Sequence, residues 1–479
     1  MSATVSALVD RCLLFAMAGG SLSQKSAGWL AEGLGGILLY QPNIQDAGQL
    51  RTLCDQIRAA GTDVLIAVNA EGGELTPMHP DGVLPHPGHL ALGALDDTAL
   101  TEAVAADIGN ELARAGINLN LAPVADIRAL PDNPLVGIRS FGADAGLVAR
   151  HAAAYIRGLQ STGVAAAAKH FPGFGSAWAT SDLTFPVVAG DLDEALRPFA
   201  AAIGSAVPAI LTSHAIYPAC GPHPATLSRE ILVGLLRERL GFDGVIIGDS
   251  LTMSAVIAQL GAAEAGVRAL NAGVDLLCMT GGFVEQRAVR DYIVAAAVSG
   301  RIAESRLAEA ANRVRCLARA HARPTGAQVP VPEWPAGLAR GLLYIDAPLP
   351  LRGSPYVLEF PENRRGGEPG AASLLTVLKE LDPGVSGLRL SSTGAALAYA
   401  VRAAPPDRPL LLLARDAHRD QWLSGNLSAI LDLRKDAILV GLGTTSDAGL
   451  AEGRYLGTRG SAEPNLRAAA LSLLGRAGS

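Results

Sequence analysis

The sequence predicts an α/β protein in which a TIM-type (β/α)8 barrel is followed by a smaller αβα sandwich domain. Over the first two thirds of the chain, short and almost wholly apolar strand candidates alternate with stretches of helical length, as in a parallel sheet buried on both faces. Eight such units occur there, which is the number that a closed barrel needs. The strand candidates are Leu13–Ala18, Gly36–Tyr40, Val64–Asn69, Asn118–Ala122, Ala165–His170, Ala209–His214, Val245–Asp249 and Val274–Met279.

Polar residues follow these apolar strands at the points where the strands end. In a barrel all such ends meet at one rim, where the loops vary over a rigid scaffold. Titratable groups from several strands are therefore a more specific sign of an active site than any single motif. The polar residues are Asn69 and Glu71 after the third strand, Asp126 and Arg139 after the fourth, Lys169 and His170 at the fifth, Ser213 and His214 at the sixth, and Asp249 at the seventh.

An open, doubly wound sheet is the alternative to the barrel, but no Gly-rich dinucleotide-binding fingerprint follows the first strand. We expect the barrel to comprise residues 1–322. A linker is expected at 323–338, because the run RPTGAQVPVPEWP contains four prolines. Residues 339–479 again alternate strand-like and helical stretches, which predicts a smaller α/β layered domain. Glu359 and Asp416, near strand ends of that domain, are weaker candidates for a contribution to the site.

Composition excludes several classes of partner. A net charge of −6 gives no basic footprint for nucleic acid, and no run of 18 apolar residues predicts a membrane span. Five cysteines without CxxC spacing, and an apolar run near the N-terminus too short for a signal peptide, favour reduced thiols in a cytoplasmic protein. We expect no cofactor and no metal; the loop with His79, His86 and His89 is interpreted as solvated rather than metal-binding.

The stretch AAKHFPGFGSAWATSDLTFP (167–186) is the densest group of such residues. An apolar strand ends in the cation Lys169 and the imidazole His170, and a loop punctuated by Pro and Gly follows. A structural turn with a solvated Lys and His is the alternative. Lys169, His170 and Arg139 together would supply hydrogen-bond donors to the hydroxyls of a polar ligand such as a sugar.

Asp249 ends a strongly apolar strand, VIIGDSLTM. A carboxylate there is costly to bury unless it is paired or faces a cleft. One interpretation is an N-cap for the helix that follows. The other is an ionised nucleophile at the barrel mouth.

Asp182 is the second carboxylate of interest. Its loop contains Phe171, Phe174 and Trp178, which would exclude water and raise the carboxyl pKa, as a general acid needs near neutral pH. One ionised and one protonated carboxyl group form the working pair of a retaining glycosidase. The alternative for Asp182 is a loop cap that binds Thr184 or neighbouring amides.

Several segments resemble glycoside hydrolase family 3, in its bacterial β-N-acetylhexosaminidase (NagZ-like) branch. They cover almost all of residues 10–280 in the family's order and include AEGGEL, NLNLAPVADI, NPLVGIRSFG, KHFPGFG, GVIIGDSLTM and ALNAGVDLLCM. LLLLARDAHRDQW and GLGTTSD resemble the αβα sandwich of two-domain members. The resemblance implies a glycosyl-enzyme formed on Asp249 and sugar-binding roles for Lys169, His170 and Arg139.

The loop after the fifth strand departs from the family's pattern of KHFPGHG followed by D-T-x-x-D-S-H. The spacing is kept, but Phe174 replaces the first His, Thr180 the Asp of the acid/base dyad, and Asp182 the catalytic His. After the third strand, Asn69 and Glu74 replace a sugar-binding Asp and an Arg of the family's D-Q-E-G-G-R. Half of the catalytic apparatus has therefore changed.

Two functions follow from these departures. In the first, the chain is a retaining β-N-acetylhexosaminidase-like hydrolase of a terminal β-linked (amino) sugar, with Asp249 as nucleophile and Asp182 as acid/base. In the second, it is a catalytically impaired or repurposed sugar-binding homologue. An unrelated barrel activity is a lesser alternative. A small carbohydrate is the expected partner, and a homodimer stays open. The expected substrate-binding residues are Lys169, His170, Arg139, Asn69, His214 and Phe174.

Overall fold

The computed structural model describes residues 2–79, 84–131, 133, 135–178, 183–326, 341–361, 373–390 and 401–476. The chain divides into two compact units, which are described separately here. The barrel unit comprises Met1–Glu71, Thr98–Val136 and Ala143–Val331. The C-terminal unit comprises Gly72–Asp97, Gly137–Gly142 and Pro332–Ser479. Most of the expected linker, 323–338, lies outside the described residues.

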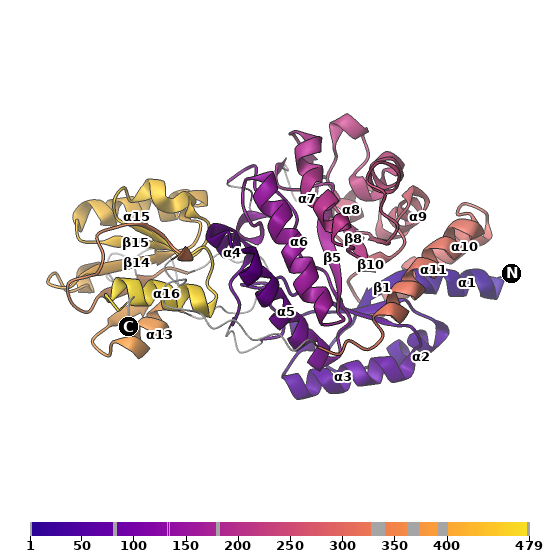
Figure 1. Ribbon diagram of the computed structural model, residues 1–479, viewed down its shortest axis with the longest axis horizontal. Coiled ribbons are helices and arrows are strands. Elements are labelled where there is room, and N and C mark those ends of the chain that lie inside the picture. The colour runs from indigo at the N-terminus through magenta and orange to yellow at the C-terminus, as the bar shows by residue number, and fades with distance from the viewer. Residues whose placement is uncertain are drawn as a thin grey trace. The chain divides into compact units, whose positions relative to one another are not determined.

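The barrel unit contains an eight-stranded sheet in the order β10-β1-β2-β3-β4-β5-β8-β9, and every pairing in it is parallel (Figure 1). A parallel bridge between Ile247 and Leu276 joins the last strand to the first, so the sheet closes into the predicted barrel. The strands are β1 (Leu13–Ala16), β2 (Gly36–Leu39), β3 (Leu65–Val68), β4 (Leu119–Asn120), β5 (Ala165–Phe171), β8 (Ala209–Thr212), β9 (Val245–Ile247) and β10 (Leu277–Met279).

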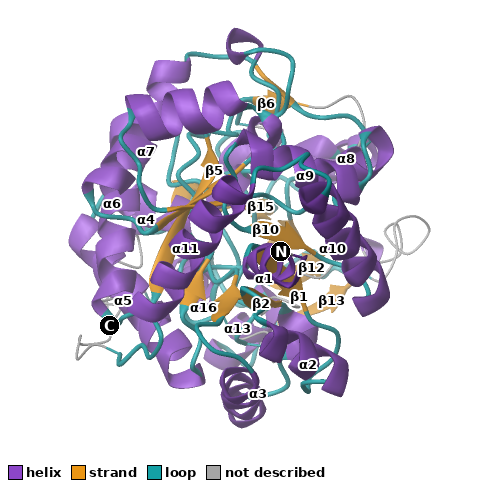
Figure 2. Ribbon diagram, turned by 90° about the vertical axis from the view of Figure 1, so that its right-hand side faces the viewer, coloured by secondary structure: helices purple, strands orange, loops and turns teal. Residues whose placement is uncertain are grey.

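Helices surround these strands (Figure 2). Asp46, Asp144 and Asp191 each cap a helix by accepting a hydrogen bond from a backbone N–H of its first turn, which satisfies donors that have no partner inside the helix. The helices are α1 (Ser2–Arg11), α2 (Gln24–Glu32), α3 (Ala47–Ala60), α5 (Thr98–Ala115), α6 (Ala145–Ser161), α7 (Leu192–Gly204), the π-helix η5 (Glu230–Arg239), α8 (Ser254–Gln259), α9 (Ala262–Ala272), α10 (Phe283–Val298) and α11 (Glu304–Ala320).

The barrel interior is filled by aliphatic side chains, as the low aromatic content requires. Alternate strand residues point inward, so Leu119 with Leu121 and Ala165 with Ala167 contribute to one buried cluster. Leu317 of α11 belongs to the same cluster. The interior is therefore a packed core, and the candidate catalytic and binding residues lie at the ends of the strands.

The C-terminal unit is an αβα sandwich, as predicted. Its sheet has the order β11-β16-β15-β14-β12-β13, parallel except for the β11–β16 pair. The sequence analysis did not identify β13 and β16. Strands are β11 (Tyr344–Asp346), β12 (Tyr356–Glu359), β13 (Ser386–Arg389), β14 (Leu410–Ala414), β15 (Ile438–Gly441) and β16 (Tyr455–Gly457), and the helices of its core are α13 (Leu374–Leu381), α15 (Gln421–Leu433) and α16 (Glu463–Leu473).

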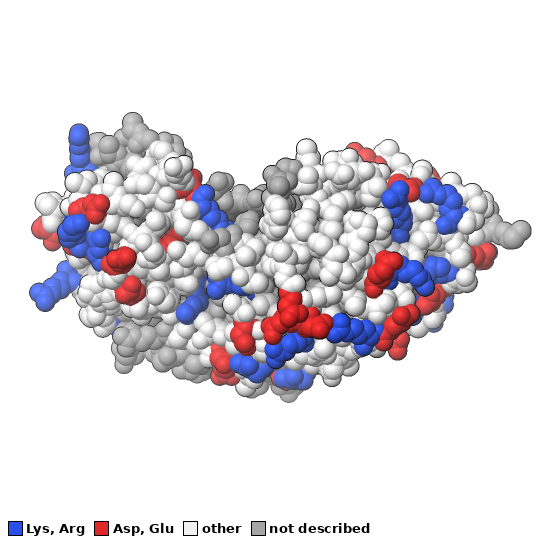
Figure 3. All heavy atoms as spheres, turned by 90° about the horizontal axis from the view of Figure 1, so that it is seen from above, with Lys and Arg blue, Asp and Glu red and all other residues white. Residues whose placement is uncertain are grey.

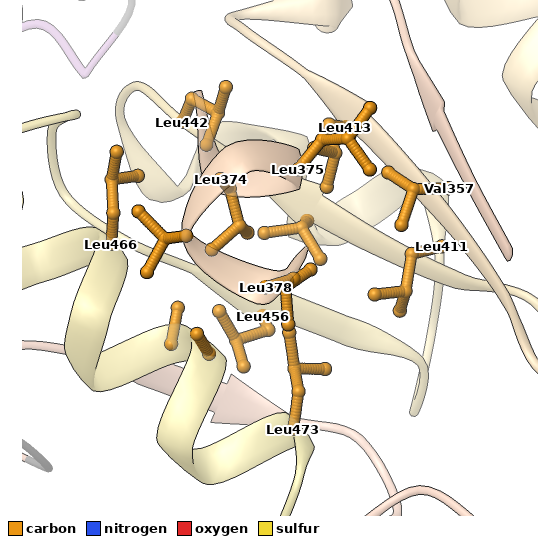
Figure 4. Close-up of a cluster of buried hydrophobic side chains, with 14 of the residues drawn as sticks. Val357, Leu374, Leu375, Leu378, Leu411, Leu413, Leu442, Leu456, Leu466 and Leu473 are labelled. Atoms are coloured by element: carbon orange, nitrogen blue, oxygen red, sulfur yellow. The ribbon is translucent and has the colours of Figure 1, made fainter. Parts of the chain in front are cut away.

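The two faces of this sheet have separate cores. Leu411 and Leu413 of β14 pack with α13 and α16 on one face (Figure 4). Leu410 and Leu412 pack with α15 on the other. This period of two makes β14 apolar throughout, because both of its faces are buried.

The segment between β3 and α5 belongs to the C-terminal unit and contains α4 (His89–Leu95). Glu74 fixes it, because its carboxylate accepts hydrogen bonds from the backbone and hydroxyl of Ser461 and from Arg415. The expected solvated loop is wrong for His86 and His89, which are 3% and 1% exposed. His89 donates from Nδ1 to the carbonyl of Arg139 (2.7 Å), so its role here is structural.

None of the described helices is long and apolar enough to cross a lipid bilayer. Acidic and basic side chains lie interspersed on the face in Figure 3 rather than in a patch of one sign. This distribution provides no extended basic surface on that face.

Candidate active site

Asp249 lies two residues beyond the end of β9, at the carboxyl-end rim of the barrel. Its Oδ1 accepts a hydrogen bond from the backbone N–H of Ser250 (2.7 Å). The residue that caps α8 is Met253, which makes no side-chain cap bond. The helix-cap interpretation of Asp249 is therefore wrong, because its half-buried carboxylate does not cap α8.

The end of β8 supports the turn that carries Asp249. The backbone N–H of Asp249 points to Thr212 Oγ1 at 3.4 Å, and His214 donates from Nε2 to the carbonyl of Ser250 at 3.0 Å. Because that acceptor is a carbonyl, Nε2 of His214 carries the proton. His214 is only 4% exposed. These two contacts hold the peptide groups immediately before Asp249 and immediately after Ser250.

Lys169 forms a buried ion pair at the ends of β3 and β5. Its Nζ lies 2.5 Å from Glu71 Oε1 and donates to Asn69 Oδ1 at 2.8 Å. The side chains of Lys169 and Glu71 are 3% and 2% exposed, so the pair neutralises two charges that would be costly alone. Since an ammonium group only donates, the amide oxygen of Asn69 faces Lys169 and its Nδ2 points elsewhere.

His170 is held by Asp126, which is fully buried. Asp126 accepts hydrogen bonds from His170 Nδ1 (2.7 Å), from the His170 backbone N–H (3.2 Å) and from the Phe174 backbone N–H (2.7 Å). A carboxylate with three donors is well satisfied, and it directs the imidazole of His170 by its Nδ1 proton. Phe174 is thereby placed through its backbone.

A register irregularity explains why both Lys169 and His170 reach polar partners. Lys169 pairs with Leu211 and Phe171 with Thr212, so His170 is an extra residue in β5. Consecutive strand residues normally point to opposite faces, and a bulge turns a side chain out of that alternation. The bulge lies where the strand meets the rim.

Two residues outside the predicted set, Tyr40 and Cys278, lie against and within the buried cluster of the barrel interior. Burial, and next the charge of Asp249, raise the pKa of the Cys278 thiol to about 12, while Lys169 opposes the shift. Burial, with the charges of Cys278 and Asp249, also raises the pKa of the Tyr40 hydroxyl. Only their positions in the sequence could have indicated these two residues, because Tyr40 directly follows β2 and Cys278 lies within β10.

The barrel unit thus carries six of the predicted residues: Asp249, Lys169, His170, Asn69, His214 and Phe174, whose ring centroid lies 5.9 Å from that of His170. Arg139 belongs to the C-terminal unit, on the 3-10 turn η2 (Gly137–Arg139). Asp182 and Thr180 lie outside the described residues.

The apolar environment expected around Asp182 stays a prediction, because that residue lies outside the described part of the chain. Phe171 is buried against Phe199, with ring centroids 5.2 Å apart, and Trp178 is 52% exposed. Across the described parts of the chain, no cluster of three or more His, Cys, Asp or Glu side chains is placed to bind a metal ion.

Comparison with known proteins identifies the family. The model of the glycosyl hydrolase family 3 N-terminal domain matches residues 13–317. A β-hexosaminidase of Pseudomonas aeruginosa is 38% identical over 252 residues, which are 51% of this chain and 74% of that protein. β-Hexosaminidase A of Pseudoalteromonas piscicida is 32% identical over 273 residues, 51% of this chain, but the match spans only 46% of that protein's length.

The structural comparison extends over both units. A family 3 β-N-acetylglucosaminidase from Paenibacillus sp. is similar with a TM-score of 0.89 and 29% identity, over 98% of this chain and 96% of that one. The family match, the barrel and the polar residues at its rim agree with one another. The chain belongs to glycoside hydrolase family 3, as a β-hexosaminidase-like member.

Proposed function

We propose that this protein hydrolyses glycosides of a terminal β-linked N-acetylhexosamine with retention of configuration. The observation that carries the proposal is the Asp249 carboxylate, half-buried at the rim of a family 3 barrel and bonded by the Ser250 N–H, on a backbone that Thr212 and His214 support. The names of the similar proteins supply the sugar class.

The proposed reaction has two steps. Asp249 attacks the anomeric carbon, the glycosidic C–O bond breaks, and the leaving oxygen takes a proton from Asp182. In the second step Asp182 removes a proton from water, which attacks the glycosyl-enzyme and releases Asp249. An anionic Asp182 would repel phosphate, which favours water as the acceptor.

Sugar binding is assigned to donors around the nucleophile. Lys169 is neutralised by Glu71 and so offers directional N–H bonds rather than a net charge. Asn69 adds an amide donor, and His170 presents the ring nitrogen opposite its bond to Asp126. We also assign Arg139, His214 and Phe174 to the substrate site, in accordance with the family resemblance.

A binding-only or impaired homologue is the second candidate. The observation that favours it is the presence of Thr180 and Asp182 where the family has its acid/base dyad. Loss of general-acid catalysis typically costs about 10²–10⁴ in rate, and least for activated leaving groups.

The test is turnover of aryl and methyl β-N-acetylglucosaminides by wild type, Asp249→Ala, Asp182→Ala and the surface control Asp243→Ala. We expect Asp249→Ala to lose at least about a thousandfold in kcat/KM on both substrates, and Asp243→Ala to lose nothing. Asp182→Ala should lose about a hundredfold or more on the methyl glycoside but far less on an activated aryl glycoside.

Each outcome distinguishes the candidates. Full activity of Asp182→Ala on the methyl glycoside would exclude Asp182 as the acid. Binding of N-acetylglucosamine without any turnover would favour the binding-only homologue. A fluorinated aryl glycoside that slows the second step should label a peptide containing Asp249, detected by mass spectrometry.

We further propose a cytoplasmic location with reduced thiols, consistent with five free cysteines. A homodimer is left as a proposal, to be tested by sedimentation velocity over a range of concentrations.

A further inference from the structure

We infer that the site takes a glycoside whose leaving group is an apolar alkyl or aryl aglycone rather than a second sugar. The inference rests on the proposed function, because it names the group that leaves when Asp249 attacks.

Four large apolar side chains are exposed on the two segments that follow β5 and β9. Trp178 is 52% exposed, Leu183 57%, Met253 42% and Ile257 50%. We call these four residues the apolar rim. Met253 and Ile257 are four residues apart at the start of α8 and so share one face. Met253 is also only four residues beyond the nucleophile Asp249.

The two segments are joined by a hydrogen bond. Gln259, the last residue of α8, donates from Nε2 to the carbonyl of Leu183 at 3.2 Å. The segment from Leu183 continues into the short strand β7 (Val187–Val188), which pairs with β6 (Ala177–Trp178). Trp178 and Leu183 therefore lie on a hairpin that contacts α8.

A groove of about 540 Å³ adjoins the rim. Phe185, Ile216, Leu227 and Leu260 supply apolar lining, and Arg229 and Arg268 supply donors. Pockets of about 300–1,000 Å³ are the usual size for a small molecule.

Phe185 connects this groove to the nucleophile. Its ring centroid lies 6.4 Å from that of His214, within the range of an aromatic contact. His214 in turn donates to the carbonyl of Ser250, the residue after Asp249. A chain of two contacts, from Phe185 to His214 and from His214 to Ser250, therefore links the groove lining to the residue after the nucleophile.

The chemistry of the rim favours an apolar aglycone over a sugar. Hydroxyl groups of a second sugar that were covered by Leu183, Met253 and Ile257 would lose hydrogen bonds to water without replacement. An alkyl or aryl group has no such penalty and gains from leaving water. A groove of this volume also fits a small molecule better than a flat protein surface.

The experiment measures binding of methyl, butyl and hexyl β-glycosides of N-acetylglucosamine and of glucose by calorimetry. A fully buried methylene gains about fourfold in affinity, so for a half-exposed rim we expect about twofold each, or roughly thirtyfold from methyl to hexyl. In Ile257→Asn and Met253→Gln this chain-length effect should fall to a few-fold. The control is Val284→Asn, because Val284 is 74% exposed on α10.

The proposed function and this inference fail in different ways. If no glycoside is hydrolysed but the chain-length effect is present and is lost in the rim variants, the aglycone site stands and the hydrolase assignment falls. Turnover with equal affinity for methyl and hexyl glycosides overturns the apolar site. So does a tighter fit for chitobiose than for the hexyl glycoside. Rim variants that change only the oligomeric state would assign the rim to a second copy of the chain and also overturn it.

Discussion

Lys169 Nζ lies 2.5 Å from Glu71 Oε1, and both side chains are almost fully buried at the rim of the barrel. Each charge offsets the desolvation cost of the other in this low-dielectric environment, and Asn69 accepts a further hydrogen bond from Lys169. The pair links the ends of β3 and β5 at the rim. Protein stability, and the substrate binding proposed for Lys169, should therefore depend on the same two side chains.

Glu71→Gln should destabilise the protein by about 3–5 kcal/mol, because it leaves the ammonium of Lys169 buried without its counter-charge. The double variant Glu71→Gln/Lys169→Met removes both charges and should recover much of this loss. Neither variant should have wild-type activity, because each changes Lys169 or its ion-pair partner and Lys169 is assigned to sugar binding. Urea unfolding and kcat/KM on an aryl glycoside separate the two effects. Equal stability of the single and double variants would contradict the ion-pair argument.

Asp126→Asn should lower kcat/KM while the protein stays folded. An amide can still accept from the Phe174 backbone, but it replaces the carboxylate that binds His170 Nδ1 at 2.7 Å. A hydrogen bond to a charged group is worth about 1.5–3 kcal/mol, which corresponds to about 10- to 150-fold in kcat/KM. Steady-state kinetics on one aryl glycoside measures the loss. Unchanged kinetics would mean that His170 does not need Asp126 for its function.

Glu74→Gln should destabilise the C-terminal unit. Glu74 is 6% exposed, and its Oε1 accepts from the Ser461 backbone at 3.0 Å and hydroxyl at 2.6 Å, as well as from Arg415. Removing the charge leaves the guanidinium of Arg415 without its counter-charge, at a cost of about 3 kcal/mol or more. Hydrogen exchange should become faster in residues 84–97, with little change in β1–β5. The exposed control Glu452→Gln should leave exchange unaltered.

Stability should fall at alkaline pH through three buried thiols. Burial raises the pKa of Cys12, Cys54 and Cys278 to about 12 each. A thiol in the unfolded chain has a pKa near 8.5, so the folded state binds the proton more tightly. This contribution is fully present below about pH 8.5 and is lost as pH rises toward 12, by roughly 1.4 kcal/mol per thiol at pH 9.5.

Urea unfolding at pH 7.5 and 9.5 under reducing conditions tests the thiol prediction. Cys54→Ala should show a smaller pH-dependent loss than wild type, by about one thiol's share. Native-state alkylation offers a second readout, because Cys316 is exposed and should react first. Rapid alkylation of Cys278 in the folded protein would contradict the assigned burial.

The fold could be predicted because its signals are local. The apolar runs that became β1–β5 and β8–β10 are each complete within a few residues, and β14 is visible as the continuous apolar run LLLLA. β13 and β16 were missed because SGLR and YLG are short and have little apolar periodicity. Burial of His86 and His89 was missed because it depends on partners from other segments.

The sequence by itself determined the eight β/α units, the sandwich that follows, and the strand ends at which polar groups gather. Tertiary structure alone decided which of those groups meet. Lys169 finds Asn69 at a separation of 100 residues, His170 finds Asp126 at 44, and Glu74 finds Ser461 at 387. Tertiary structure likewise decided the bulge at His170 and the grouping of Gly72–Asp97 with the C-terminal unit. Periodicity encodes which face of an element is buried, whereas contacts between distant segments depend on how the packed elements bring them together.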